Sequence, residues 1–352
     1  LAAKDRVLFY ASPDLKTWQP TGSFGGGYGS TGGVWETPEL FQLSAGDESR
    51  WVLTVGVGDG GPTGGSGTQY FIGQFDGQTF ISENPRETVL WADYGADYYA
   101  PQSWNEEPNG RRLMIGWMSN WQYARLVPAT GWRGAFSLIR EMALVKTGQG
   151  FRLAQQPIPE LQTLRGERQH WQDEVLRPGV NLLAGQRGLA LELLAEFECL
   201  DETASFGFHL RVGPGERTTL RYSVSDQTLS LARARSGAVD FEPGFARLHT
   251  AALLPNDRKI RLRILLDTTS VEVFANAGLV TFCESILSRR RGLPPARKQS
   301  EVRPHTQHQR KILGSWCHFA FSCSARSLPP TGRSGTSLNP WTICREPRFC
   351  RM

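Results

Sequence analysis

The stretch Leu8-Phe9-Tyr10-Ala11-Ser12-Pro13-Asp14-Leu15-Lys16-Thr17-Trp18 has a counterpart 62 positions later, Tyr70-Phe71-Ile72-Gly73-Gln74-Phe75-Asp76-Gly77-Gln78-Thr79-Phe80. Each stretch reads as a β-strand, a turn led by an aspartate, and a threonine with an aromatic residue that open the next strand. Short apolar runs separated by turn residues continue through the first 145 residues, and no helical period lasts more than a turn. This part of the chain is therefore predicted to be all-β.

The repeat extends to two further segments. Arg50–Thr54 falls on Arg112–Gly116 at the same shift of 62, and Trp35–Phe41 falls on Tyr98–Trp104 at a shift of 63. Three matches in one order favour a repeated four-stranded unit, typical of propeller blades, over coincidence among hairpins. The innermost strand of a blade lines the central channel. We expect the segments at 35–41 and 98–104 to be innermost strands, with Glu36 facing the channel mouth.

Residues 153–175 interrupt this pattern with two prolines and a short helical stretch. They are predicted to be a linker that follows a propeller part spanning residues 1–152. From 176 to 286, evenly spaced strands with alternating faces predict a β-sandwich. Its strands are expected at Leu189–Phe197, Ser205–Val212, Leu220–Val224, Thr228–Ala232, Lys259–Leu266 and Ser270–Ala275.

The tail at 287–352 differs from the body in charge, cysteine content and pattern. The 352-residue chain has 39 basic and 34 acidic side chains, of which the tail holds 13 and 2, leaving 26 and 32 in the body. Four of the six cysteines are also in the tail, without zinc-ligand spacing. Because the excess of positive over negative charge lies in the tail alone, we do not expect nucleic acid or a membrane as a partner. The tail is predicted to result from a shift of reading frame near Leu287, with a disordered native tail as the alternative.

Glu36 is the best-supported catalytic candidate in the sequence. Glycoside cleavage needs a carboxylic acid that is protonated near neutrality, and a second carboxylate as nucleophile or base. The segment Gly116–Tyr123 adds three aromatic residues, whose flat apolar faces suit sugar rings. Spacing alone leaves open that Glu36 is a surface carboxylate near a turn and that the aromatic residues are propeller core. Asp93 and Asp97 are further acids before the second inner strand, with turn formation as the alternative role.

Six segments carry a family resemblance: Gly33–Phe41, Gly64–Gly73, Asp97–Trp104, Ile115–Trp121, Trp132–Ala135 and Ser270–Asn276. They read GVWETPELF, GGSGTQYFIG, DYYAPQSW, IGWMSNW, WRGA and SVEVFAN. In this order, over residues 7–286, they resemble glycoside hydrolase family 32, the invertase, levanase and exo-inulinase group. The resemblance implies part of a five-bladed β-propeller followed by a β-sandwich. It also implies retaining hydrolysis of β-fructofuranosides by double displacement, without a metal or organic cofactor.

Glu36 takes the place of the family's acid/base glutamate. In the family this residue lies in a Glu-Cys-Pro-Asp motif, and this chain has Thr37 for the cysteine and Glu39 for the aspartate. Because Thr37 keeps a small polar group behind the acid, we expect the function of Glu36 to be retained.

The resemblance also implies substrate contacts. Trp117 or Trp121 matches a family tryptophan that contacts the fructosyl ring, Asp97 lies in a motif that borders the same pocket, and Trp35 flanks the acid. These four are the predicted substrate-binding residues. The Gly-rich loop Thr63–Gly67 looks most like levanases and exo-inulinases, which favours levan or inulin over sucrose alone.

Two family motifs do not occur in the chain. The family nucleophile lies in Asn-Asp-Pro-Asn and the transition-state stabiliser in Arg-Asp-Pro, and the sequence contains neither. We therefore expect an N-terminally truncated fragment that is inactive or nearly so by itself, since general acid catalysis alone contributes only ~10²–10⁴-fold. Alternatives are a sucrose invertase, a fructosyltransferase, a non-catalytic fructan-binding pseudoenzyme and, least well supported, a propeller for protein contacts. A polymeric substrate favours a location outside the cytoplasm, extracellular or periplasmic.

Overall fold

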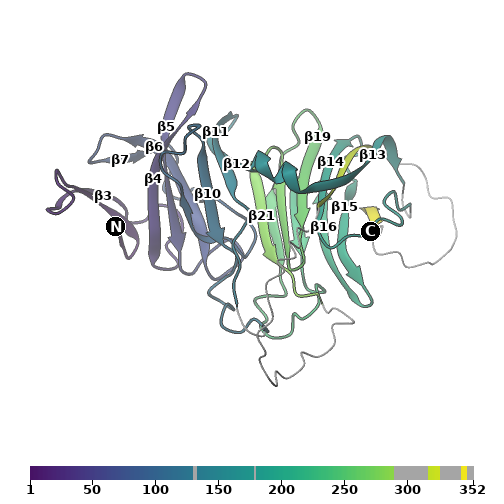
Figure 1. The fold of residues 1–352 in the computed structure, drawn as a ribbon. Coiled ribbons are helices and arrows are strands. Elements are labelled where there is room, and N and C mark those ends of the chain that lie inside the picture. Colours follow the sequence, from purple (N-terminus) through teal and green to yellow (C-terminus); the bar gives the residue numbers. More distant parts are fainter. Residues whose placement is uncertain (130–132, 178–179, 289–315, 326–341, 347–352) are drawn as a thin grey trace, which may run out of the picture.

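In the computed structural model, residues 1–129, 133–177 and 180–288 are described in full, together with the backbone of 316–325 and 342–346. Figure 1 shows three sheets side by side, followed by two sheets that pack face to face. Apart from one 3₁₀ helix, every regular element in the described residues is a strand, which confirms the all-β prediction. No helix among them is long and apolar enough to cross a membrane.

The three N-terminal sheets are antiparallel and follow one another along the chain. The first contains β1 (Ala2–Ala3), β2 (Arg6–Ala11) and β3 (Gln19–Gly25). The second contains β4 (Trp35–Ala45), β5 (Glu48–Val57), β6 (Gly67–Phe75) and β7 (Phe80–Ser82), with β8 (Leu90–Trp91) paired to β6. The third contains β9 (Tyr99–Ser103), β10 (Arg112–Trp117), β11 (Arg140–Thr147) and β12 (Gly150–Pro157).

The second sheet is buried on both faces because it lies between the other two. Successive side chains of a strand point to opposite faces. Accordingly, Val52 and Ile72 pack with the core shared with the third sheet, whereas Leu53 and Phe71 pack with the core shared with the first. This face-to-face stacking of sheets is the arrangement of propeller blades.

The aspartate-led turns of the repeat have one geometry. Asp14 Oδ1 accepts hydrogen bonds from the backbone N–H of Lys16 and Thr17, both at 2.8 Å. Asp76 Oδ1 accepts the corresponding pair, from residues 78 and 79, at 2.8 and 2.7 Å. The residue after each aspartate has a positive φ, 58° at Leu15 and 96° at Gly77. The repeat seen in the sequence is therefore a repeat of backbone conformation.

The junction between the two halves is shorter than the predicted linker at 153–175. Strand β12 continues to Pro157, Pro159–Leu164 form the 3₁₀ helix η1, and β13 (Arg165–Leu176) begins at once. Pro157 is tolerated because it is the last residue of an edge strand, and Pro159 because the first position of a helix needs no N–H partner. The prolines thus mark the ends of elements and do not interrupt a longer strand.

The second half is a sandwich of two sheets around one apolar core. The predicted strands appear as β14 (Leu191–Cys199), β15 (Ser205–Gly213), β16 (Glu216–Ser223), β17 (Thr228–Ala232), β19 (Lys259–Leu266) and β20 (Ser270–Ala275). Three further strands of these sheets were not predicted in the fully described residues: β18 (Leu248–Ala252), β21 (Val280–Ser285) and β13, which lies in the predicted linker.

Two backbone segments of the tail also join the sandwich. Strand β22 (Trp316–Ala325) pairs in parallel with β13 and β14, and β23 (Thr342–Glu346) pairs antiparallel with β15. The rest of the predicted anomalous tail, from 289 onward, lies outside the described residues.

Arg140 of strand β11 joins the third sheet to the sandwich. Its guanidinium is fully buried and forms ion pairs with Asp93 at 2.8 Å and with Glu272 of β20 at 3.0 Å. It also lies over the ring of Tyr98, 4.0 Å from the centroid. A buried charge is tolerated only when it is paired, so this contact holds the propeller part and the sandwich in one register.

We predict that Arg140→Met lowers the free energy of unfolding by about 3–5 kcal/mol, because two buried carboxylates lose their cation. The matched control is Lys146→Met on the same strand. Lys146 pairs with Glu48 at side-chain exposures of 68% and 44%, so its loss should cost about 0–1 kcal/mol. Urea denaturation of both variants provides the measurement, and equal losses would contradict the assigned role.

Candidate active site

Strands β4 and β9, the edge strands of the second and third sheets that were predicted to be innermost, carry matching distortions. The register shifts between Glu36 and Glu39 on β4, and between residues 115 and 117 where β10 meets β9. Thr37 has φ 45° and Ala100, its repeat counterpart, has φ 46°. Each precedes a proline. A positive φ is strained for a β-branched residue, and such strain and bulges re-aim side chains at functional sites.

The bulge gives Glu36 and Glu39 different surroundings. Glu36 is exposed at the mouth of a pocket, and its Oε2 accepts a hydrogen bond from the Tyr99 hydroxyl. Glu39 instead accepts from the Ser103 backbone N–H at 3.0 Å and from the Ser103 hydroxyl. Glu39 therefore fastens β4 to β9, while Glu36 keeps one oxygen, Oε1, without a protein donor among the described contacts.

Tyr99 was missed in the sequence, although the repeat contains the signal. It stands 63 positions after Glu36, at the equivalent place in the next blade, so the two innermost strands bring them together. Burial, and then the hydrogen bond to Glu36, raise the pKa of Tyr99. The phenol thus stays protonated at neutral pH and acts as a donor toward the Glu36 carboxylate.

The pocket is open, about 820 Å³ in volume, and largely apolar around one acid. Trp117 and Trp121 form one wall, with ring centroids 4.8 Å apart, and Tyr99 lies edge-on to Trp117 at 6.4 Å. Of the described residues that line the pocket, Glu36 alone carries a carboxylate. Apolar walls around a single oriented polar group are typical of small-molecule sites. The pocket lining therefore includes four of the predicted site residues, Trp35, Glu36, Trp117 and Trp121.

Trp35 does not present its ring to the pocket. Its side chain is 0% exposed, its Nε1 donates to the Ser30 carbonyl at 2.9 Å, and its ring packs on Phe71. Neighbouring residues of a strand point to opposite faces, so the exposure of Glu36 places Trp35 in the core. Trp35 is among the residues that line the pocket, but its buried ring offers no face to a sugar in this structure, so its substrate contact stays a prediction.

Asp97 also lies away from the pocket. Its carboxylate is 0% exposed and pairs with Arg233 of the sandwich at 2.5 Å. It accepts further hydrogen bonds from the Tyr123 hydroxyl at 2.7 Å and the Ser285 N–H at 2.8 Å. Asp97 is thus an interface residue and its predicted substrate contact is corrected. The sequence could not show this, because Arg233 is 136 positions away.

The chain matches one family along most of the described length. A model described as Glycosyl hydrolases family 32 N-terminal domain matches residues 1–157, and one described as Glycosyl hydrolases family 32 C terminal matches residues 160–300. A propeller part with an acidic, aromatic pocket, joined to a β-sandwich, is the architecture of a class of glycoside hydrolases. The chain belongs to glycosyl hydrolase family 32.

Individual relatives agree with this assignment. A levanase of Bacillus subtilis (strain 168) is 45% identical over 298 residues, which are 82% of this chain and 44% of the levanase. An extracellular exo-inulinase of Aspergillus awamori is 34% identical over 81% of this chain and 56% of its own length. A crystal structure of exo-inulinase from that fungus superposes with TM-score 0.71 and 32% identity, over 82% of this chain and 58% of that one. The chain thus spans about half the length of these relatives.

We predict that Thr37→Gly raises the free energy of unfolding by about 1 kcal/mol, because glycine adopts the left-handed conformation without strain. Ala100→Gly at the equivalent position should also be stabilising. The control is Gln42→Gly, an exposed residue in the ordinary backbone of β4, which should be destabilising. Urea denaturation compares the three variants. The interpretation fails if Thr37→Gly destabilises as much as Gln42→Gly.

Proposed function

We propose that the protein acts in hydrolysis of β-fructofuranosidic bonds in levan, inulin or sucrose, with Glu36 as the general acid/base. The observation that carries this proposal is the Glu36 carboxylate itself, turned outward by a bulge into a pocket with a tryptophan wall. In the retaining mechanism, Glu36 protonates the oxygen of the leaving group and then takes a proton from the water that releases fructose. Tyr99 orients the carboxylate for both steps.

Double displacement also requires a nucleophilic carboxylate close to the acid. No other acid lines the described pocket, and the family motifs for the nucleophile and the stabiliser do not occur in these 352 residues. We therefore expect slow turnover by this chain alone. The same observation supports a second candidate function, binding of fructan without hydrolysis.

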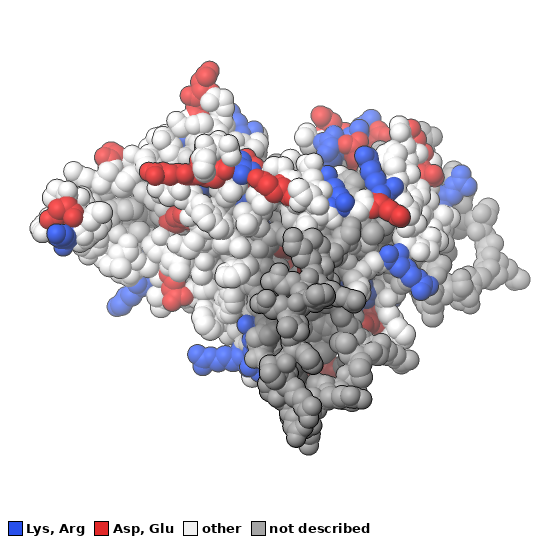
Figure 2. All heavy atoms as spheres, viewed as in Figure 1, with Lys and Arg blue, Asp and Glu red and all other residues white. Residues whose placement is uncertain are grey.

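The ligand class is inferred from the pocket and from the relatives. Trp117 and Trp121 offer apolar faces to sugar rings. On the face in Figure 2, acidic and basic side chains of the described residues are interspersed rather than separated by sign, so this view shows no extended basic patch of the kind that binds polyanions. Two relatives are named levanase and extracellular exo-inulinase, which supports fructans as substrate and a location outside the cell.

Binding can be tested on the chain as it is. Titration with 1-kestose, followed by calorimetry, should show binding. Trp121→Ala should raise Kd about three- to tenfold through loss of an aromatic contact. The control is Trp18→Ala, because Trp18 is equally exposed, at 51%, and lies outside the pocket. Absence of binding by the unaltered chain, or equal effects of the two variants, would remove the support for this site.

Chemistry is tested by fructose release from levan, inulin and sucrose. Release by the 352-residue chain should be slow. If the coding DNA upstream of Leu1 encodes Asn-Asp-Pro-Asn and Arg-Asp-Pro, Glu36→Gln in the extended protein should lower kcat by ~10²–10⁴-fold. Glu39→Gln, in the same strand but bonded to Ser103, should lower it far less. Similar losses in both variants would contradict the role of Glu36, and a coding sequence without these motifs would favour the binding function.

A further inference from the structure

Trp121 belongs to a helical turn that faces the pocket on one side and the protein interior on the other. The N–H of residue 124 bonds to the Asn120 carbonyl at 2.8 Å, and that of residue 127 to the Tyr123 carbonyl at 3.1 Å. The Trp121 side chain is 51% exposed, whereas Asn120 and Tyr123 are 0% and 1% exposed. The position of the Trp121 ring therefore depends on what holds its two buried neighbours.

Asn120 fastens the turn to the propeller part. Its Nδ2 donates to the carbonyls of Ser66 at 3.0 Å and Ala96 at 2.9 Å, and its Oδ1 accepts from the Ser66 N–H at 3.1 Å. The Trp121 N–H donates to the Ser66 hydroxyl at 3.0 Å. These contacts hold the start of the turn, residues 120 and 121, against Ser66 of the Gly-rich loop Thr63–Gly67.

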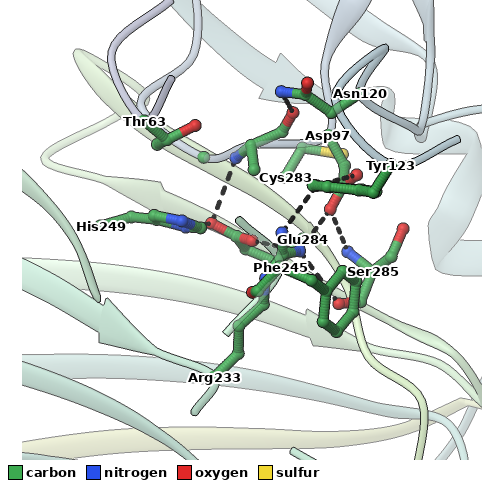
Figure 3. A network of polar contacts seen from close by, with 12 residues as sticks. Thr63, Asp97, Asn120, Tyr123, Arg233, Phe245, His249, Cys283, Glu284 and Ser285 are labelled. Atoms are coloured by element: carbon green, nitrogen blue, oxygen red, sulfur yellow. Dashed lines mark hydrogen bonds and ion pairs between the residues drawn. The ribbon is translucent and has the colours of Figure 1, made fainter. Parts of the chain in front are cut away.

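Tyr123 fastens the other side of the turn to the sandwich. Its hydroxyl donates to Asp97 Oδ1 at 2.7 Å and accepts from Arg233 Nη2 at 2.6 Å. Figure 3 shows this arrangement, in which Arg233 reaches the tyrosine from the sandwich sheet. Gly244 of the sandwich lies against Gln122, so close that a Cβ there would come within 2.4 Å of the glutamine side chain. Two successive residues after Trp121 thus touch the sandwich.

Arg233 is itself immobilised. It is 0% exposed, pairs with Asp97 at 2.5 Å and with Glu284 of β21 at 2.8 Å, and donates through Nε to the Phe245 carbonyl at 2.6 Å. Its guanidinium also lies 3.9 Å from the centroid of the Phe245 ring. Moving it would leave two buried carboxylates without their arginine partner, so the Tyr123 hydroxyl meets a donor in a fixed place.

We infer that Arg233, acting through Tyr123, is a positioning residue for Trp121, so that the sandwich sets the orientation of one wall of the pocket. The consequence for sugar binding rests on the function proposed above, whereas the orientation of the ring does not. The competing explanation is that the network only holds the two halves together.

The test is Tyr123→Phe, which removes one hydroxyl and leaves the ion pairs of Arg233 in place. With 5-fluorotryptophan incorporated, the Trp121 resonance is assigned by its loss in Trp121→Phe. This resonance should shift or broaden in Tyr123→Phe. It should also do so in Arg233→Lys, because lysine keeps the positive charge but lacks the second guanidinium nitrogen that donates to the Tyr123 hydroxyl. The control is Tyr222→Phe, which loses a buried hydroxyl bonded to the Leu253 carbonyl at 3.0 Å in the sandwich core.

We expect the Trp121 resonance to be unchanged in Tyr222→Phe, and Kd for 1-kestose to rise about two- to tenfold in Tyr123→Phe, as for the loss of one hydrogen bond. An unchanged Trp121 resonance in Tyr123→Phe would overturn the inference, as would an equal change in Tyr222→Phe. If the unaltered chain does not bind 1-kestose, the proposed function fails, while the fluorine spectra still decide the role of Tyr123.

Discussion

Two fully buried arginines cross between the propeller part and the sandwich, and the rest of the structure depends on this pairing. Arg140 reaches from the third sheet to Glu272, and Arg233 reaches from the sandwich to Asp97. On the propeller side their partners Asp93 and Asp97 are four residues apart in one loop. Because an unpaired buried charge is very costly, only one register of the two halves satisfies both arginines. Such pairs add specificity of arrangement more reliably than net stability.

The same loop leads directly into the candidate site. Asp97 is fixed by Arg233, Tyr98 lies under the Arg140 guanidinium, and Tyr99 donates to Glu36. The interface therefore holds the first residues of β9, and β9 in turn holds the acid on β4. The strained backbone at Thr37 and Ala100 persists because the surrounding packing leaves these residues no other conformation. The acid lies on β4, its hydrogen-bond donor on β9, and the tryptophan wall on β10 and on the turn that follows it.

Much of the fold could be predicted from local pattern. Turn chemistry and strand alternation are properties of short segments, so the repeat predicted the blades, and six sandwich strands appeared close to their expected places. Glu36, Trp117 and Trp121 were also found from sequence, and the structure brings them to one pocket. The repeat aligns Tyr99 with Glu36, so Tyr99 could have been selected from the sequence. Whether the two side chains form a hydrogen bond depends on how the neighbouring blades pack.

The sequence by itself determined that the chain is all-β, that its first part repeats, and that Glu36 is the acid to examine. Only the tertiary structure decided which polar and aromatic residues face solvent. Trp35 turned into the core and Asp97 into the interface because each found a partner distant in sequence, Phe71 for the ring and Arg233 for the carboxylate. Periodicity reports on neighbours two to four residues away, whereas the burial of a charge or an indole depends on atoms that folding brings from elsewhere in the chain.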